Sequence, residues 1–238
     1  MCTLTLLRAE DALTLTMNRD DAPARPEAPP RIWEDGAVRF AGPVDLEAGG
    51  TWIGVNAAGV AACLLNRYDA APKGARSRGG IVPLALAGQC LDSAANAIEA
   101  LTHDAYSPFA CVIVSSSAAC RFDWNGSAMV RQSISLEEPM MMTSSSWRFA
   151  AVAAQRQALF RETMDTGGAQ ALSGFHCARR ERDEAWAPMM RRAYAHTKSV
   201  TQIILGLTDI ELRYWPRDHA IERGLSRPSH VIRIARRP

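Results

Sequence analysis

The chain has 238 residues, a formal net charge of +2, 47% hydrophobic residues and 22% charged residues. This is the composition of an ordinary soluble globular protein, and we expect one domain over residues 1–238 with a substantial core. The small net charge argues against a nucleic-acid-binding protein. No stretch approaches the roughly 18 apolar residues of a membrane-spanning helix, so stable membrane insertion is not expected. The six cysteines form no CxxC pair, which predicts free thiols in a reducing cytoplasm.

The N-terminal third predicts strands joined by turns. Apolar and polar residues alternate at 2–7 and again at 13–17, with "RAEDA" between them, so these segments predict a β-hairpin. The proline-rich segment 20–30 predicts an extended, irregular loop. Short strands are predicted at 37–42, 51–55 and 60–66, with "NAAG" as the turn between the last two. The polar segment 67–80 predicts another loop.

The rest of the chain mixes helices and strands. Helices are predicted at 81–88 and 91–103, the second with Asp92 or Ser93 as its cap, and the clearest amphipathic helix covers 146–164 with a serine cap. Segment 178–192 predicts a charged helix or a solvated loop. Strands are predicted at 109–117, 119–126, 127–134, 200–206, 210–215 and 230–235. Because helices and strands do not alternate regularly, this order favours an α+β fold with segregated helices over a doubly wound parallel sheet.

Cys2 directly follows the initiator methionine. Methionine removal is favoured by a small second residue, and it would leave Cys2 with both a thiol and a free α-amino group. The ordinary pKa of an α-amino group is about 7.7–8.0, so near neutral pH it can accept the proton of the thiol. Nucleophile and base would then lie on one residue. The alternative is a core cysteine that happens to stand second in the chain.

The stretch "MNRDD" lies on the predicted hairpin partner of the Cys2 strand, so residues 18–20 are expected beside residues 2–3. Arg19 would lower the pKa of the thiol, and an aspartate would bind the α-amino group or orient Arg19. Asn66 ends a predicted strand, where its carboxamide could donate a hydrogen bond to a developing oxyanion. The alternatives are solvated charges at a strand end and a turn-forming asparagine.

Other candidates concern ligand binding. Arg76 and Arg78 precede a Gly-Gly pair and a predicted helix start, where they could hold a carboxylate or phosphate; a solvated loop is the alternative. Trp52 is expected at a pocket mouth or in the core. His176 and His196 lack any metal-ligand or CxxCH spacing, so no metal and no cofactor are expected.

Several stretches resemble the NRDE family, also called the transport and Golgi organisation protein 2 family. They are "MCTLTLL", "MNRDD", "RP" at 25–26, "GGTWIGVNAAGVAACLLNRY", "SRGGIV" and, more weakly, "MTSSSW" and "AHTKSVT". Asp21 stands where the name motif of the family ends in glutamate. The resemblance implies a four-layer αββα sandwich of the N-terminal nucleophile hydrolase type.

The resemblance extends to the choloylglycine hydrolase and penicillin V acylase group, and it implies residue roles. Cys2 would be the nucleophile, Arg19 its activator, Asp20 the amine-binding carboxylate and Asn66 the oxyanion donor. Asp21 remains open as a substitute for Asp20. The residues that would contact substrate are Asp21, Trp52, Asn56, Arg78 and Ser144, the last standing where the acylases carry an asparagine.

Two function classes follow from the resemblance. The first is an N-terminal cysteine hydrolase that acts on linear amides of small molecules or transfers acyl groups. The second is a non-catalytic carrier or chaperone that binds haem, acyl-CoA or another lipid ligand in the same pocket. Both act in the cytoplasm and neither needs nucleic acid.

Overall fold

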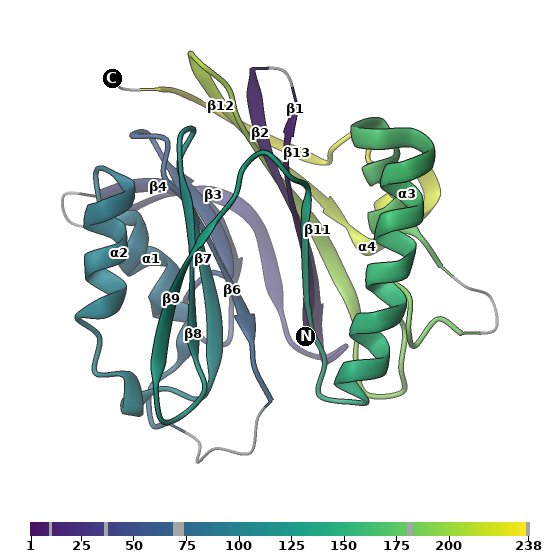
Figure 1. Cartoon of the computed structure of the whole chain (residues 1–238), viewed down its shortest axis with the longest axis horizontal. Helices are drawn as coiled ribbons and strands as arrows, with labels where there is room; N and C mark the ends of the chain where they lie inside the picture. The colour runs from purple at the N-terminus through teal and green to yellow at the C-terminus, as the bar shows by residue number, and fades with distance from the viewer. Residues whose placement is uncertain (10, 36–37, 69–73, 180–182, 237–238) are drawn as a thin grey trace.

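The computed structural model describes residues 1–9, 11–35, 38–68, 74–179 and 183–236. Two antiparallel sheets lie face to face, and helices cover the outer face of each sheet (Figure 1). The predicted α+β class and the αββα order of layers are therefore confirmed. None of the helices in these residues is long and apolar enough to cross a membrane.

The first sheet contains the N-terminal hairpin at its centre. β1 (Cys2–Ala9) and β2 (Ala12–Asp21) pair so that Cys2 lies opposite Arg19 and Ala9 lies opposite Ala12, as predicted. The sheet has the strand order β10-β1-β2-β11-β12-β13. Its other strands are β10 (Met140–Ser144), β11 (His196–Leu205), β12 (Asp209–Pro216) and β13 (His230–Ala235).

The second sheet follows chain order from β3 to β9, as a meander of antiparallel neighbours. Its strands are β3 (Glu27–Asp35), β4 (Val38–Asp45), β5 (Ile53–Asn56), β6 (Ala61–Asn66), β7 (Phe109–Val114), β8 (Ala119–Trp124) and β9 (Met129–Ile134). The short helices are η1 (Arg78–Gly80), α1 (Ile81–Leu86), α2 (Leu91–Glu99) and η2 (His103–Ala105). α1 and α2 cover this sheet (Figure 1).

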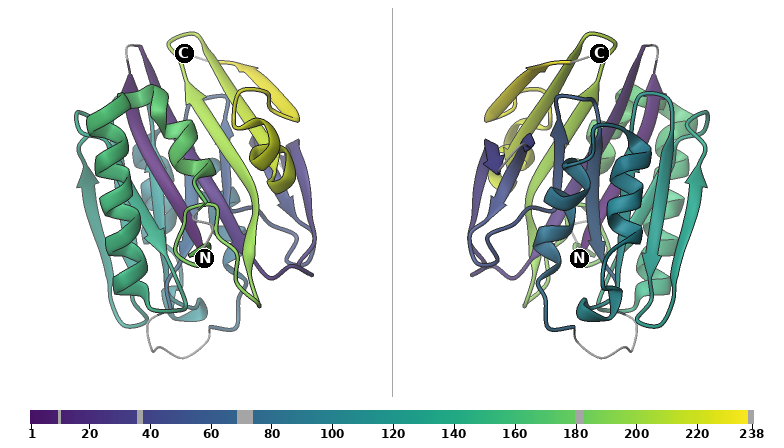
Figure 2. Two further views of the ribbon diagram at one scale, coloured as in Figure 1. Left: turned by 90° about the vertical axis from the view of Figure 1, so that its right-hand side faces the viewer. Right: turned by 90° about the vertical axis from the view of Figure 1, so that its left-hand side faces the viewer.

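The first sheet is covered by α3 (Phe149–Cys177) and α4 (Arg217–Arg223) on the opposite side of the molecule (Figure 2). The main core lies between the sheets, where alternate residues of β1 and β2, such as Leu4, Leu15 and Met17, are fully buried. The opposite face of the same hairpin carries polar residues toward α3, including Thr3 and Asn18. The N-terminus lies at the start of β1 in the first sheet, at the end of the molecule away from the C-terminus (Figures 1 and 2).

The caps of two helices differ from the prediction, and a third segment takes one of its two predicted forms. α3 begins at Phe149 and has no serine cap: Arg148 stands at its N-terminus in the left-handed conformation, and Gly168 adopts a positive φ inside it. Cys90 caps α2, and Ser93 completes a capping box instead of serving as the cap. Residues 183–192 form turns, which agrees with the predicted loop and not with the helix, although 187–190 are buried; residues 180–182 lie outside the described residues.

The proline-rich segment is also different, since β3 begins within it at Glu27. β3 is the edge strand of its sheet, and its register with β4 shifts between Ala28 and Arg31, around the two prolines. An edge strand tolerates proline because one side of its backbone needs no ladder partner. This strand brings Glu27 to the site described next.

Candidate functional site

A cavity of about 330 Å³ lies where the chain begins. Cys2 and Arg19 are cross-strand partners, so their side chains share the face of the sheet that points toward the second sheet. Seven of the predicted site residues line the cavity: Cys2, Arg19, Asp20, Asp21, Trp52, Asn66 and Arg78. Further lining residues include Met1, Arg25, Asp45, Thr51, Arg76 and Ser107. The cavity is therefore lined by both positively and negatively charged side chains.

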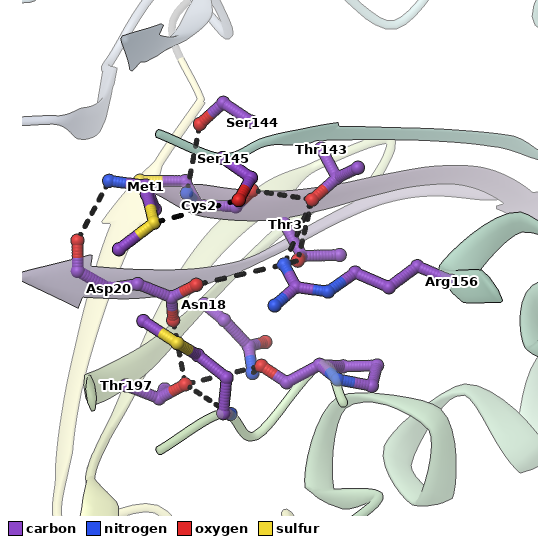
Figure 3. Close-up of polar contacts among 12 residues, drawn as sticks. Met1, Cys2, Thr3, Asn18, Asp20, Thr143, Ser144, Ser145, Arg156 and Thr197 are labelled. Atoms are coloured by element: carbon purple, nitrogen blue, oxygen red, sulfur yellow. Dashed lines mark hydrogen bonds and ion pairs between the residues drawn. The ribbon is translucent and has the colours of Figure 1, made fainter. Parts of the chain in front are cut away.

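Cys2 is held firmly by its main chain. Its N–H donates to the hydroxyl of Ser144 at 3.0 Å, and its carbonyl accepts from the hydroxyl of Thr143 at 3.0 Å (Figure 3). The residue is 7% exposed, and this burial raises the pKa of the thiol although the Met1 amine and Arg19 oppose the shift. With Met1 present the thiol is therefore protonated near neutral pH, which is opposite to the expected lowering of its pKa.

Met1 extends the strand by one residue. Its amine donates to the carbonyl of Asp20 at 3.0 Å and to the hydroxyl of Tyr68 at 2.9 Å, and its carbonyl accepts from the Asp20 N–H at 2.8 Å. Burial disfavours the charged amine, but the nearby Cys2, Tyr68 and Asp20 outweigh it and raise the pKa of the amine to about 10. The structure thus contains an ordered site for a positively charged chain start.

Arg19 is clamped by carboxylates. The side chain is 3% exposed, and its guanidinium donates to Glu27 and to Asp45 and lies 3.1 Å from a carboxylate oxygen of Asp21. Its flat face stacks on Trp52 at 4.3 Å from the ring centroid. Because these partners use its donors, Arg19 acts on the thiol through space and not through a hydrogen bond. Sequence reasoning missed Glu27 and Asp45.

The two candidate aspartates lie on different faces of the sheet. Asp21 is partly exposed and faces the cavity, where it pairs with Arg19. Asp20 is 1% exposed and points toward α3, where it accepts a 2.6 Å hydrogen bond from Thr197. One oxygen of Asp20 has no hydrogen-bond partner among the described residues, and Arg156 lies 3.7 Å from that oxygen. Burial raises the pKa of Asp20, and Arg156 and the Met1 amine oppose this shift.

Arg156 links the buried face of the hairpin to α3 (Figure 3). Its guanidinium donates to the hydroxyls of Thr3 and Thr143 and to the carbonyls of Trp186 and Ala187. Thr143 in turn donates to the carbonyl of Cys2, so Arg156 supports the nucleophile candidate from behind the sheet.

The sequence contains a signal for this arginine that was not among the predicted site residues. Val152, Arg156 and Phe160 recur at a spacing of four residues, and all three are buried on one face of α3. A charged residue in an apolar helical stripe needs partners inside the protein.

Asn66 and Arg78, the predicted contacts of the oxyanion and of the substrate, both line the cavity. Asn66 ends β6 and also lines a second, neighbouring cavity of about 190 Å³. Arg78 donates to the carbonyl of Pro108 at 2.8 Å, and burial lowers the pKa of its guanidinium. No carboxylate among the described residues forms an ion pair with Arg78. Its charge is thus available to an anionic ligand.

Asn56 and Ser144 do not line this cavity. The amide nitrogen of Asn56 donates to the carbonyls of Leu86 and Gly88 at 2.9 and 2.8 Å, and its oxygen accepts from the Val60 N–H. The expected substrate contact of Asn56 is therefore corrected to a structural role that fixes the turn after β5. Ser144 lines the second cavity, and its hydroxyl positions Cys2.

We predict that Asn56→Ala lowers the free energy of unfolding by about 2–3 kcal/mol, because it leaves buried backbone groups without partners. Asn66→Ala serves as the matched control at the end of the neighbouring strand and should change stability by less than about 0.5 kcal/mol. Denaturant unfolding of both variants measures this difference. Equal stability of the two variants would show that Asn56 is not the structural residue of the pair.

Within the part of the chain that the structure describes, histidine, cysteine, aspartate and glutamate side chains do not form any group of three or more that could hold a metal ion. His176 is fully buried, where its ring nitrogens contact Thr5 and Asn18. This burial lowers the pKa of the imidazole to about 3, so the ring is neutral.

The fold is shared with solved structures of N-terminal nucleophile hydrolases. The chain is similar to an N-acylethanolamine-hydrolyzing acid amidase orthologue from Caenorhabditis elegans, with a TM-score of 0.60 and 12% identity over 87% of this chain and 94% of that chain. It is similar to a variant of the conjugated bile acid hydrolase from Clostridium perfringens, with a TM-score of 0.60 and 10% identity over 99% and 97% of the two chains. For penicillin V acylase from Agrobacterium tumefaciens the TM-score is 0.51, with 12% identity over 99% of this chain and 86% of that chain.

A search of curated protein sequences gave no match. The family model for Transport and Golgi organisation 2 matches residues 1–206, which include every candidate residue described above. The chain therefore belongs to the Transport and Golgi organisation 2 family.

Proposed function

We propose that the chain, after removal of Met1, is an N-terminal cysteine hydrolase of linear amides or an acyl transferase. The observation that carries this proposal is the position of Cys2. It begins β1, an inner strand of the first sheet, faces a cavity beside the buried Arg19, and is fixed by hydrogen bonds at its N–H and at its carbonyl. The similarity to amidase and acylase structures supports the fold that such chemistry uses.

In the proposed reaction the α-amino group of Cys2 takes the proton of its own thiol. The thiolate sulfur then bonds to the carbonyl carbon of the substrate, and the carbonyl oxygen becomes an oxyanion that accepts a hydrogen bond from Asn66. When the carbon–nitrogen bond breaks, the α-ammonium returns the proton to the leaving amine. Water then hydrolyses the thioester, or another nucleophile accepts the acyl group.

The surrounding charges favour this proton transfer. Burial raises the pKa of the Cys2 thiol, and after removal of Met1 the α-ammonium group of Cys2 itself would lie on the same residue as the sulfur and oppose this shift. Arg19 favours the thiolate, and Asp20 favours a protonated amine at the chain start. Asp20 would therefore stabilise the ammonium form electrostatically, while Asp21 orients Arg19.

The substrate that fits the cavity best is a small amide with an anionic group. Arg25, Arg76 and Arg78 line the cavity together with Arg19, and Arg78 forms no ion pair with the described carboxylates. Trp52 supplies an apolar wall. The six cysteines are free thiols, which supports the accompanying proposal of a cytoplasmic location.

The second candidate is a carrier that binds an anionic ligand such as haem or an acyl-CoA without reacting with it. The observation in its favour is the buried, protonated Cys2 thiol while Met1 is present. A chain that keeps Met1 has a charged cavity but lacks an activated nucleophile. Whether Met1 is retained or removed therefore distinguishes the two candidate functions.

The test is hydrolysis of a panel of linear N-acyl amides, with and without a carboxylate, by the wild type and by Cys2→Ala. We expect turnover by the wild type and at least a 1000-fold loss in Cys2→Ala, because no other group replaces the nucleophile. Cys90→Ala is the matched control, since Cys90 is an exposed thiol far from β1 in the sequence. Undiminished turnover in Cys2→Ala would overturn the proposal.

A further inference from the structure

The side chain of Met1 fills a space of its own at the start of β1, on the α3 side of the first sheet, while Met1 itself also lines the cavity. It is 7% exposed and packs on Met190 and Ala195, which are buried. The hydroxyl of Ser146 and the guanidinium of Arg192 lie 3.5 and 2.9 Å from its sulfur. We call the space bounded by these groups and Ser145 the Met1 chamber. Removal of Met1 would empty it beside Cys2.

The positively charged guanidinium of Arg192 contacts uncharged acceptor groups when Met1 is present. One nitrogen contacts the Met1 sulfur, which is a weak acceptor, and the hydroxyl of Ser145 at 3.2 Å. The carbonyl of Ala185 holds the rest of the guanidinium through two hydrogen bonds of 3.0 and 2.8 Å, and Trp147 stacks on it at 4.9 Å. No carboxylate in the described residues lies within ion-pair distance of Arg192. The arginine is therefore fixed in place and lacks an anion.

We propose that the vacated Met1 chamber is a substrate subsite for a short acidic side chain, of the length and polarity of a glutamyl residue. The inference rests on the proposed removal of Met1. A glutamyl side chain that enters the chamber as the Met1 side chain does, with its backbone set back from the Cys2 amine, brings its carboxylate to Arg192 and Ser146. A carboxylate bonds a guanidinium far more strongly than a thioether does.

Two further features of the chamber favour a ligand whose acidic side chain lies next to an amide bond. The Asp20 N–H, which now bonds the Met1 carbonyl, becomes available to a carbonyl of the ligand when Met1 leaves. The apolar floor of Met190 and Ala195 contacts the methylene groups. Asp20 would repel the incoming carboxylate, but Arg156 compensates the charge of Asp20, and the new ammonium of Cys2 adds a second cation.

The binding experiment uses a chain that starts at residue 2, released from a cleavable N-terminal fusion, with Cys2→Ala so that no reaction occurs. Calorimetry compares N-acetyl-L-glutamate with N-acetyl-L-norleucine, which has a similar shape and no side-chain charge. We expect the glutamate derivative to bind at least tenfold more tightly. Arg192→Gln should remove this preference, and Arg191→Gln, a change at the exposed neighbouring arginine, should keep it.

The chain that retains Met1 should lose at least tenfold in affinity for the glutamate derivative, because its own side chain fills the chamber. Ala195→Leu, which fills the chamber differently, should have the same effect and provides a second variant if Arg192→Gln fails to fold. Equal affinity for the two probes, or a preference that survives both variants, would overturn the subsite. Since the probes bind without reaction, these results are independent of whether Cys2 proves catalytic.

Discussion

Arg156→Met will lower the free energy of unfolding by about 3–5 kcal/mol, the usual cost of leaving a buried charge without its partner. Arg156 is 1% exposed and lies 3.7 Å from Asp20, which is itself 1% exposed. The variant also removes donors from Thr3 and Thr143. Urea unfolding at pH 7 measures the loss.

Two controls identify the cause of that loss. Arg161→Met changes an exposed arginine on the same helix and should cost less than about 0.5 kcal/mol. Asp20→Asn combined with Arg156→Met removes both charges and should recover part of the loss. If Arg156→Met costs no more than Arg161→Met, the buried network does not stabilise the hairpin.

The pH dependence of Arg156→Met has a defined sign. The pKa of Asp20 is already raised by burial, and loss of Arg156 raises it further. A carboxyl group whose pKa is higher in the folded protein favours folding when it is protonated, so stability falls as pH rises from its unfolded pKa, about 3.9, through its folded pKa. The deficit of Arg156→Met should therefore be smaller at pH 4 than at pH 7.

The second large effect concerns the chain start. At pH 7 the Met1-free chain should react with iodoacetamide at Cys2 at least about tenfold faster than the chain that retains Met1. In the chain that retains Met1, burial raises the pKa of the Cys2 thiol, so alkylation of that form should increase only at alkaline pH. In the Met1-free form an ordinary α-amino group can take the proton near neutral pH.

The other cysteines serve as internal controls in the same sample. Cys63 and Cys111 are fully buried with raised thiol pKa values, so peptide mapping should find them unreactive in both forms. Cys90 is exposed and should react in both. If removal of Met1 leaves the alkylation rate of Cys2 unchanged, the proposed activation by the α-amino group is wrong.

The position of Cys2 opposite Arg19 could be predicted because local alternation determines the hairpin. The same period of two also implies that Asp20 points away from Cys2 while Asp21 shares the face of Arg19, a consequence that sequence reasoning did not draw. β3 was missed because proline argues against a strand, and only the assembled sheet reveals that this strand lies at an edge.

The clamp on Arg19 and the partners of Asp20 could not be predicted in the same way. Glu27 and Asp45 reach Arg19 from the second sheet, and Thr197 reaches Asp20 from β11 near the other end of the chain. These contacts depend on sheet pairing and packing between distant segments, for which one sequence contains no local pattern. The Asn56 prediction failed for a related reason, since its partners lie on and after α1.

We propose Cys2 as the nucleophile of the Met1-free chain. The most direct measurement is intact-mass analysis, at acidic quench, of that chain mixed with an activated ester that carries a carboxylate. We expect one acyl group per chain, located on Cys2 by peptide mapping, removed by hydroxylamine as a thioester and absent from Cys2→Ala. Acylation of Cys90 alone, or an equal adduct in Cys2→Ala, would contradict it.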